Sequence, residues 1–441
     1  MRHKVVFPFL LSLCSVMLPA CAPSAATRQS YTIDDVWTAY DAFNRQYLDS
    51  TNYLYKNTTA DSAAVDRWNG AAAIWCQPMY VDIAMDAMRL AESVGDSARA
   101  EKYRTLSGRI LDGNIRHYRN FDFDDNDTNL GWFIYDDIQW WTITLARAAA
   151  TLGRDDCRRL AEESFARVWY GSPKTGDTGS YADPAKGLGG GMFWQWQPIE
   201  NPNPNVAGDG KMSCINFPTA VAAALLYRLA PEGRGADPQP ERWSNSHGDF
   251  VRPHFEPRER YLEMAREIYD WSVANLTDST GMVHDHRHGD HASGHPLLYN
   301  QGTFIGASAL LYMITGEERY LDNARAGADY SVNVLSAEHG YLPWAHSETE
   351  PYSQGSLEQG IYPAIWAQYM KLLVDSCGQE QYRPFIEKNI AAGWGNRNPA
   401  TDITDGEAWK ATPSDTVIGS YAASSTPALM LLFPPESVNK K

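Results

Sequence analysis

The chain has 441 residues, of which 44% are apolar and 21% are charged, so it can bury a large core and is not a disordered protein. Its net charge is −16, and no long basic stretch offsets this balance. Nucleic-acid binding needs cations that neutralise phosphates, so that class is largely excluded, and a polyanionic substrate is disfavoured. The 15 tryptophans and 24 tyrosines suit stacking on sugars, although a large helical core also uses aromatic rings as filler.

The first 20 residues predict a lipoprotein signal peptide. A basic start is followed by the apolar run Val5–Leu18, which is too short to span a membrane. The segment Leu18–Cys21 resembles the bacterial lipoprotein box, so Cys21 is the expected lipid anchor and residues 21–32 are the expected tether. An ordinary secretory signal is the alternative. The prediction places the protein in the bacterial cell envelope, anchored to the outer membrane. No acidic residue follows Cys21 directly, which slightly favours the periplasmic face over the cell surface.

Helical spacing of apolar residues dominates the remaining chain and predicts an all-α protein. The clearest segments are Trp75–Leu90, Ile138–Leu152, Thr219–Leu229, Tyr261–Leu276, Phe304–Ile314 and Tyr362–Leu373. The polar stretch Arg228–Pro257 interrupts this pattern without changing it on either side, so it is interpreted as a surface insert.

An internal repeat indicates how these helices are arranged. Ten identities relate the window Arg260–Gly281 to the window Arg319–Gly340, which begins 59 residues later. Each copy reads as one helix, a turn with a glycine and a second helix, so the repeating unit is a helical hairpin. About 400 residues hold six or seven such hairpins. We therefore expect an (α/α)6 toroid or barrel in a single domain over residues 33–433, with an open solenoid as the alternative.

Asp136 and Asp137 stand out among four Asp-Asp pairs because aromatic residues surround them. Helical spacing begins just after them, so they belong to the first turn of a helix, with Trp140 one turn further on. An apolar wall raises a carboxyl pKa, and a second carboxylate raises one of the two further. Glycoside hydrolysis needs such a pair, one protonated and one ionised. A capping box, with Asp136 as N-cap and Gln139 three residues later, is an equally good interpretation of these residues.

Other polar motifs indicate no metal and no cofactor. The glycine-rich run Gly187–Trp196 has no dinucleotide-binding spacing, but it could bring bare backbone close to a ligand. The acidic loop Asp122–Asp127 lacks the glycine of a calcium loop. A histidine-rich loop matches no zinc signature and is interpreted as a solvated loop; it holds His284, His286, His288, His291 and His295. Four cysteines without a CxxC pair favour buried thiols over disulfides; they are Cys76, Cys157, Cys214 and Cys377.

Several short motifs carry a family resemblance. They are Tyr135–Trp141, Gly190–Trp194, Asn216–Pro218, Tyr299–Gly306, Leu311–Tyr312 and Thr315–Gly316. In this order they resemble glycoside hydrolase family 76, the endo-α-1,6-mannanases that cut the backbone of fungal-type mannan. The resemblance extends from about Val36 to Leu373. It implies an (α/α)6 barrel, retention of anomeric configuration and no cofactor. The insert Arg228–Pro257 and the proline-rich stretch Pro198–Pro204 depart from the family's compact pattern.

The same resemblance implies a role for each site residue. Asp136 would be the nucleophile and Asp137 the general acid/base. The residues expected to contact substrate are Tyr135, Trp140, Trp194, Asn216, Asp285, Tyr299, Asn300 and Gln301. The expected function is that of a monomeric, retaining endo-α-1,6-mannanase acting on α-1,6-linked mannan or manno-oligosaccharides. The alternatives are a non-catalytic glycan-binding helical lipoprotein, an exo-acting α-mannosidase and an N-acylglucosamine epimerase.

Overall fold

The computed structural model describes residues 31–435, except 126, 128–129, 131, 133, 196–209, 246–247, 289 and 344–356. The predicted signal peptide, Cys21, most of the tether and the stretch Pro198–Pro204 lie outside the described residues. None of the helices found within them is long and apolar enough to cross a membrane.

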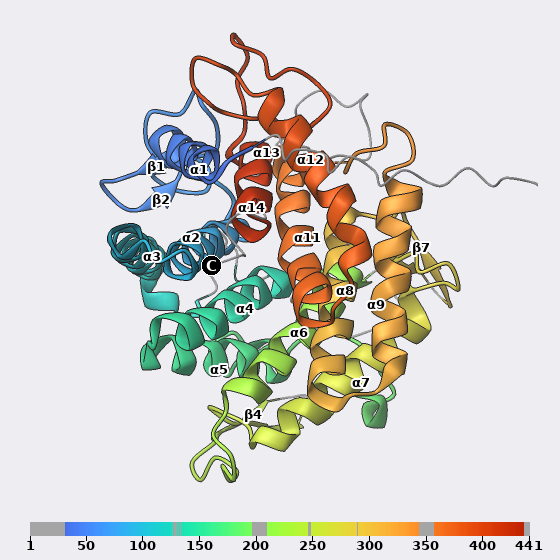
Figure 1. Ribbon diagram of the computed structural model, residues 1–441. Coiled ribbons are helices and arrows are strands. Elements are labelled where there is room, and N and C mark those ends of the chain that lie inside the picture. Colours follow the sequence, from blue (N-terminus) through green and yellow to red (C-terminus); the bar gives the residue numbers. More distant parts are fainter. Residues whose placement is uncertain are drawn as a thin grey trace, which may run out of the picture.

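In the described part of the chain, six helices form an inner ring (Figure 1). They are α2 (Gln77–Ser93), α4 (Tyr135–Leu152), α6 (Ser213–Leu229), α8 (Leu298–Thr315), α11 (Tyr362–Lys371) and α14 (Ser425–Leu432). Each contacts the next in chain order, and α14 returns to contact α2, so the ring is closed. The closure excludes an open solenoid and confirms the predicted (α/α)6 barrel.

Six outer helices cover this ring, each packed against inner helices. They are α1 (Ile33–Tyr47), α3 (Ser97–His117), α5 (Asp155–Tyr170), α7 (Arg258–Leu276), α9 (Glu318–Tyr330) and α12 (Arg383–Gly395). The repeat windows correspond to α7 and α9 with the loops that follow, two successive outer helices, as the predicted helical hairpin requires. One π-helical turn continues α9 over Ser331–Leu335, and another continues α11 over Leu372–Ser376.

Burial explains why the two rings differ in composition. Inner helices such as α6 are buried almost all round, whereas outer helices such as α3 bury one face only. Close approach within the inner ring needs small residues. A Cβ on Gly306 of α8 would lie 2.0 Å from the ring of Tyr369 on α11, so only glycine permits this contact.

The two ends of the barrel differ in their connections. At one end, short turns join α2 to α3, α4 to α5 and α8 to α9, whereas the long insert joins α6 to α7; Gly153 and Gly316 end α4 and α8 there with positive φ. Long loops join outer to inner helices at the opposite end. We call this the loop end. It lies at the N-termini of all six inner helices, which is where functional side chains can gather.

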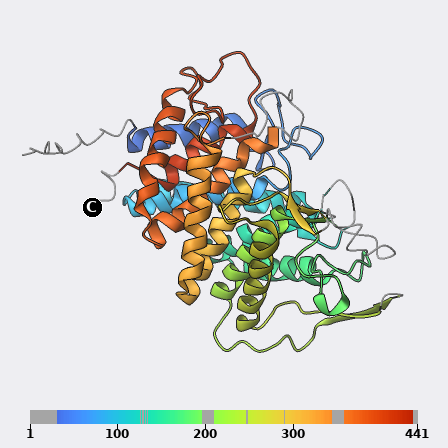
Figure 2. The same ribbon diagram turned by 90° about the vertical axis from the view of Figure 1, so that its right-hand side faces the viewer.

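The strands are short and lie in the connections. β1 (Leu48–Asp49) pairs with β2 (Leu54–Tyr55), and β3 (Lys211–Met212) pairs with β6 (His286–His288), which pairs with β7 (His291–Ser293), all antiparallel. The insert between α6 and α7 forms the antiparallel hairpin β4 (Glu241–Asn245) and β5 (Gly248–Arg252). Figure 2 shows this hairpin projecting at the lower right, so the insert is a surface excursion, as predicted. A short helix, α13 (Ser420–Ala423), precedes α14.

Candidate active site

Asp136 and Asp137 lie in the first turn of α4, at the loop end. The N-cap is Ile134, whose backbone is extended, and no side chain caps the helix. The capping-box interpretation is therefore wrong, because Asp136 is already inside the helix and Gln139 donates instead to Thr219 Oγ1 at 2.9 Å. The helix begins at Tyr135, whose backbone N–H donates outside the helix to a carbonyl at 2.9 Å. Both acids thus stand where the helix dipole favours negative charge.

Both carboxyl groups are buried. Asp136 is 8% exposed and Asp137 is 4% exposed. Asp136 Oδ1 and Asp137 Oδ2 have no hydrogen-bond partner within the described structure. A buried carboxylate with an unpaired oxygen is costly, so its protonated form becomes easier to populate. Two such groups side by side provide the acid and base that sugar chemistry requires.

The surroundings raise the pKa of both aspartates. Burial raises the pKa of Asp137 well above its ordinary value, and the charges of Asp136 and Glu358 raise it further, whereas Arg67 opposes them. Burial also raises the pKa of Asp136, but hydrogen bonds from the Cys214 thiol, an indole and backbone N–H groups lower it again. Both carboxyl groups therefore favour the protonated form more than an exposed aspartate does, and because they interact they titrate as a pair. The roles of nucleophile for Asp136 and acid for Asp137 stay predictions from the family resemblance.

Four aromatic rings gather beside the aspartates and form what we call the aromatic wall. It consists of Trp75, Trp140, Tyr299 and Tyr362. The centroids of Trp75, Trp140 and Tyr299 lie 6.2 Å from one another, and Tyr299 stacks on Tyr362 at 4.3 Å. Aromatic faces of this kind stack on the apolar faces of sugars. The predicted residues Trp140 and Tyr299 are thus brought together.

Trp75, Tyr362, Glu358 and Arg67 were not predicted as site residues. Trp75 Nε1 donates to Glu358 Oε2 at 2.7 Å, which ties the aromatic wall to an acid that acts on the pKa of Asp137. The positions of Trp75 and Tyr362 relative to the inner helices could have identified them as site residues. Trp75 lies two residues before the first residue of α2 and Tyr362 begins α11, so both lie at the start of an inner helix, as Asp136 does in α4.

The structure also places Asp285, Asn300 and Trp194 at the loop end. Asn300 Nδ2 lies 3.5 Å from Asp285 Oδ1, and Asn300 Oδ1 is buried without a partner among the described residues. Asp285 keeps part of its side chain exposed, and His286 lies 3.1 Å from its other oxygen. Trp194 is half-buried and contributes to the pKa of Asp136. These groups retain the hydrogen-bonding capacity that a sugar hydroxyl needs, so their predicted contact with substrate stays a prediction.

Three other predicted contact residues are already engaged by the protein. Asn216 makes three hydrogen bonds of 2.8–3.1 Å to backbone groups before α6. The amide of Gln301 bonds backbone groups of the α7–α8 loop and of α9. Tyr135 donates its hydroxyl to Asp177 Oδ1 at 2.7 Å. All three are fully buried. The structure therefore shows these three side chains bonded within the protein, which suits a positioning role; their predicted contact with substrate stays a prediction.

The glycine-rich run serves packing instead of ligand approach. Gly190 and Gly191 have φ of 78° and 75°, and a Cβ on either would lie 2.6 Å from the Trp271 ring. Glycine is required there because the backbone lies flat against an indole. The expectation that bare backbone faces a ligand at these two positions is not met.

The polar loops show no metal-binding geometry in the described residues, and no cluster of three or more ligand-type side chains occurs among them. In the acidic loop, Asp125 and Asp127 each lie 2.7 Å from the Arg119 guanidinium, which occupies their oxygens. The described cysteines are free thiols, three of them buried, which confirms the predicted absence of disulfides among them.

Comparison with known proteins gives one family. Residues 254–433 match the model of glycosyl hydrolase family 76. No curated protein shows a significant match to the chain. Among solved structures, the α-1,6-mannanase GH76A of Salegentibacter sp. HEL1_6 is 20% identical with a TM-score of 0.65, covering 91% of this chain and 98% of that chain. An inactive variant of that enzyme, with two neighbouring aspartates changed to asparagine, was solved with α-1,6-mannotriose.

Two further structures share the fold. The family 76 mannosidase Bt3792 of Bacteroides thetaiotaomicron is 17% identical with a TM-score of 0.62, covering 92% of this chain and 97% of that chain. Dfg5 of Chaetomium thermophilum, solved with glucosamine, is 14% identical with a TM-score of 0.59, covering 93% and 92%. The family match over the C-terminal part and the shared fold over nearly the whole chain together confirm the resemblance to glycoside hydrolase family 76.

Proposed function

We propose that this protein is a retaining endo-α-1,6-mannanase. Asp136 attacks the anomeric carbon of a mannosyl unit while Asp137 gives its proton to the departing glycosidic oxygen. The mannosyl–Asp136 ester that forms is hydrolysed by water, and Asp137 takes the proton of that water. The ester bond breaks, Asp136 regains its carboxylate and Asp137 is again protonated, so no cofactor is needed.

The observation that carries this proposal is the buried pair itself. Two adjacent carboxyls with unpaired oxygens and raised pKa values lie beside an aromatic wall. A capping or structural pair has no need of such burial. Adjacent Asp residues in a helical first turn hold their carboxyls roughly 5–7 Å apart, a range that includes the spacing for direct attack. The inactive double-aspartate variant of the Salegentibacter enzyme supports the choice of chemistry and substrate.

The decisive experiment is incubation with unbranched α-1,6-mannan. We expect a ladder of manno-oligosaccharides, and proton NMR during early turnover should show the α-anomer before mutarotation. Release of mannose alone would identify an exo-acting enzyme. A β-anomer appearing first would show that the pair activates water instead of forming an ester. Binding of mannan without new reducing ends would favour the glycan-binding lipoprotein.

The pKa argument predicts a shift of the pH profile in a Cys214 variant. The thiol lowers the pKa of Asp136 by hydrogen bonding, so Cys214→Ala should raise that pKa. Activity requires ionised Asp136, hence the acidic limb of kcat/KM should move to higher pH, by roughly one pH unit. Cys214→Ser keeps a donor at the same position and should leave the limb near its wild-type pH. An acidic limb unmoved in the alanine variant would contradict the assignment of Asp136.

We also propose that the protein acts in the bacterial cell envelope, held by an acylated Cys21 on the outer membrane. The basis is the lipoprotein box at Leu18–Cys21. The mass of the mature N-terminal peptide tests it, since a peptide starting at residue 21 without acyl chains would exclude the anchor.

A further inference from the structure

The insert between α6 and α7 starts at the short-turn end of the barrel but reaches the loop end along the outside of α5. Arg234, near its start, binds Glu162 in the middle of α5 at 2.5 Å. Glu256, near its end, accepts a hydrogen bond from Tyr170, the last residue of α5. The hairpin strand β5 packs on the same helix. The insert is therefore anchored along α5 from the middle of this helix to its last residue.

The base of the hairpin in this insert is bonded to the loop that precedes α4. Arg252, the last residue of β5, donates from both terminal nitrogens to the two oxygens of Asp124 at 2.8 Å each. It also donates to the Gly171 carbonyl at 2.9 Å and to Glu241 at 2.7 Å. Its side chain is 11% exposed, and paired, fork-like contacts of this kind are among the stronger ion pairs. Burial raises the pKa of the Asp124 carboxyl, but the hydrogen bonds and the charge of Arg252 outweigh burial and hold this pKa below its usual value.

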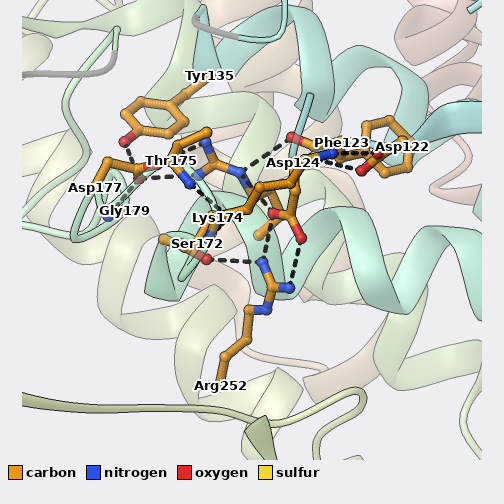
Figure 3. Close-up of polar contacts among 12 residues, drawn as sticks. Asp122, Phe123, Asp124, Tyr135, Ser172, Lys174, Thr175, Asp177, Gly179 and Arg252 are labelled. Carbon is orange, nitrogen blue, oxygen red and sulfur yellow. Dashed lines mark hydrogen bonds and ion pairs between the residues drawn. The ribbon is translucent and has the colours of Figure 1, made fainter. Parts of the chain in front are cut away.

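A second arginine continues the contact towards the catalytic pair. Arg167, almost fully buried, lies with Nε 3.3 Å from Asp124 Oδ1 and binds Asp177 at 2.8 and 3.0 Å. Asp177 in turn accepts the Tyr135 hydroxyl at 2.7 Å. Figure 3 shows this row of alternating charges, with Arg252 at one end and the Tyr135 ring at the other. Tyr135 is followed in the chain by Asp136.

We propose that Arg252 is a positioning residue for the reaction. Through Asp124, Arg167 and Asp177 it fixes the Tyr135 ring, and with it the first turn of α4 that carries the two aspartates. The inference rests on the proposed function and goes beyond it by giving the insert a role. In the absence of Arg252, Asp124 loses its main counter-charge, so Arg167 is drawn towards Asp124 and its grip on Asp177 loosens. A displacement of the reacting carboxyls well below 1 Å lowers the rate of attack without removing the substrate-binding surface.

The same insert offers a matched control. The Arg234–Glu162 ion pair is as buried as the Arg252–Asp124 pair, with Arg234 12% and Glu162 5% exposed. It fastens the insert to α5, and the hydrogen bonds of Arg234, to Glu162 and to the Glu256 carbonyl, do not lead to Tyr135 within the described residues. Arg234→Met should therefore reproduce any general loss of stability caused by breaking an ion pair of the insert, with no effect transmitted to the catalytic pair.

The experiment compares Arg252→Met, Arg252→Lys and Arg234→Met with the wild type on α-1,6-mannan. We expect Arg252→Met to lower kcat about tenfold while its KM stays within about twofold of the wild-type KM. Arg252→Lys should recover part of the lost kcat, and Arg234→Met should keep the wild-type kcat. Combining Arg252→Met with Tyr135→Phe should lower kcat no further than the more damaging single change, because both act through one row of contacts. Equal kcat for the two methionine variants, or multiplicative losses in the double variant, would overturn the proposal.

A second readout needs no substrate and separates the two proposals. Amide hydrogen exchange over residues 118–136 should speed up in Arg252→Met and stay at the wild-type rate in Arg234→Met. If the wild type does not cleave mannan, the proposed function fails while the exchange result still decides whether Arg252 holds this segment. Unchanged exchange in Arg252→Met would overturn the positioning role even in an active enzyme.

Discussion

Replacing either Asp136 or Asp137 with asparagine is expected to lower kcat on α-1,6-mannan by about a thousandfold or more. Loss of the nucleophile or of the acid removes on the order of 4 kcal/mol of transition-state stabilisation. The fold should survive. Both carboxyls have raised pKa values, which means that ionising them in the folded protein costs stability above pH 4 or so, and a neutral amide avoids this cost. The melting temperature at pH 7 should therefore be unchanged or higher. Reducing-sugar kinetics and thermal melts check both statements.

The chain supplies a control in the Asp-Asp pair that opens α5. Asp155 is 96% exposed in its side chain, so it shares the sequence pattern of the catalytic pair without its burial. Asp155→Asn should keep full activity. Normal turnover in Asp136→Asn with a lowered melting temperature would show that the pair is structural.

An activated aryl mannoside separates the two roles. Its leaving group needs no proton, so Asp137→Asn should still form the mannosyl-enzyme and release a burst of phenol, whereas Asp136→Asn should release none. The reverse pattern would exchange the assignments of nucleophile and acid.

The helical architecture was predictable because apolar periodicity and the repeat both report packing within and between neighbouring hairpins. The first residues of the helices could not be predicted from apolar periodicity. The predicted segments Ile138–Leu152, Thr219–Leu229 and Phe304–Ile314 begin three to six residues after the true starts of α4, α6 and α8. The first turn of α4 with Asp136 was predicted from its aromatic setting and not from periodicity, whereas the first turns of α6 and α8, which hold Asn216 and Tyr299, were missed. Side chains that serve the site or bond the loops are polar where the pattern calls for apolar residues, so the functional turns are those that periodicity misses.

The remaining features depend on contacts between distant segments, which a single sequence does not reveal. The aromatic wall joins Trp75 to Tyr299 and Tyr362 across more than half of the chain. Arg252 meets Asp124 from 128 positions away. Asn216 and Gln301 were predicted to contact substrate, but residue type alone does not tell whether an amide bonds a sugar or a backbone group. Only the three-dimensional structure shows which backbone groups lie within reach of such an amide.

The largest effect on stability is expected from Arg147→Met. Arg147 of α4 forms an ion pair with Asp82 of α2 inside the barrel, where Asp82 is 2% exposed. Burial already raises the pKa of Asp82, and Arg147 is the main group opposing that rise. Without the guanidinium, Asp82 remains as a buried acid that has lost its main counter-charge, although the weaker effect of Arg89 still opposes the rise of its pKa. Breaking a buried pair by removing one partner costs about 3 kcal/mol or more of unfolding free energy at pH 7.

The pH dependence of that loss distinguishes it from simple loss of packing. In Arg147→Met the pKa of Asp82 in the folded state lies further above its unfolded value, so folding favours the protonated acid. The stability difference from wild type should be smallest below the unfolded pKa and grow as pH rises towards the folded pKa. Denaturant unfolding at pH 5 and pH 7 measures this; a cost equal at both pH values would point to packing alone. Arg104→Met, which breaks an exposed pair with Glu92 at 2.6 Å, should cost less than about 1 kcal/mol.

The Asp82–Arg147 pair borders a small internal cavity together with Trp75 and Trp140, so a charge left unpaired there lies directly behind the aromatic wall. We therefore expect the destabilised variant to lose mannan binding at a lower temperature than wild type, because the wall and the pair share one layer of the barrel.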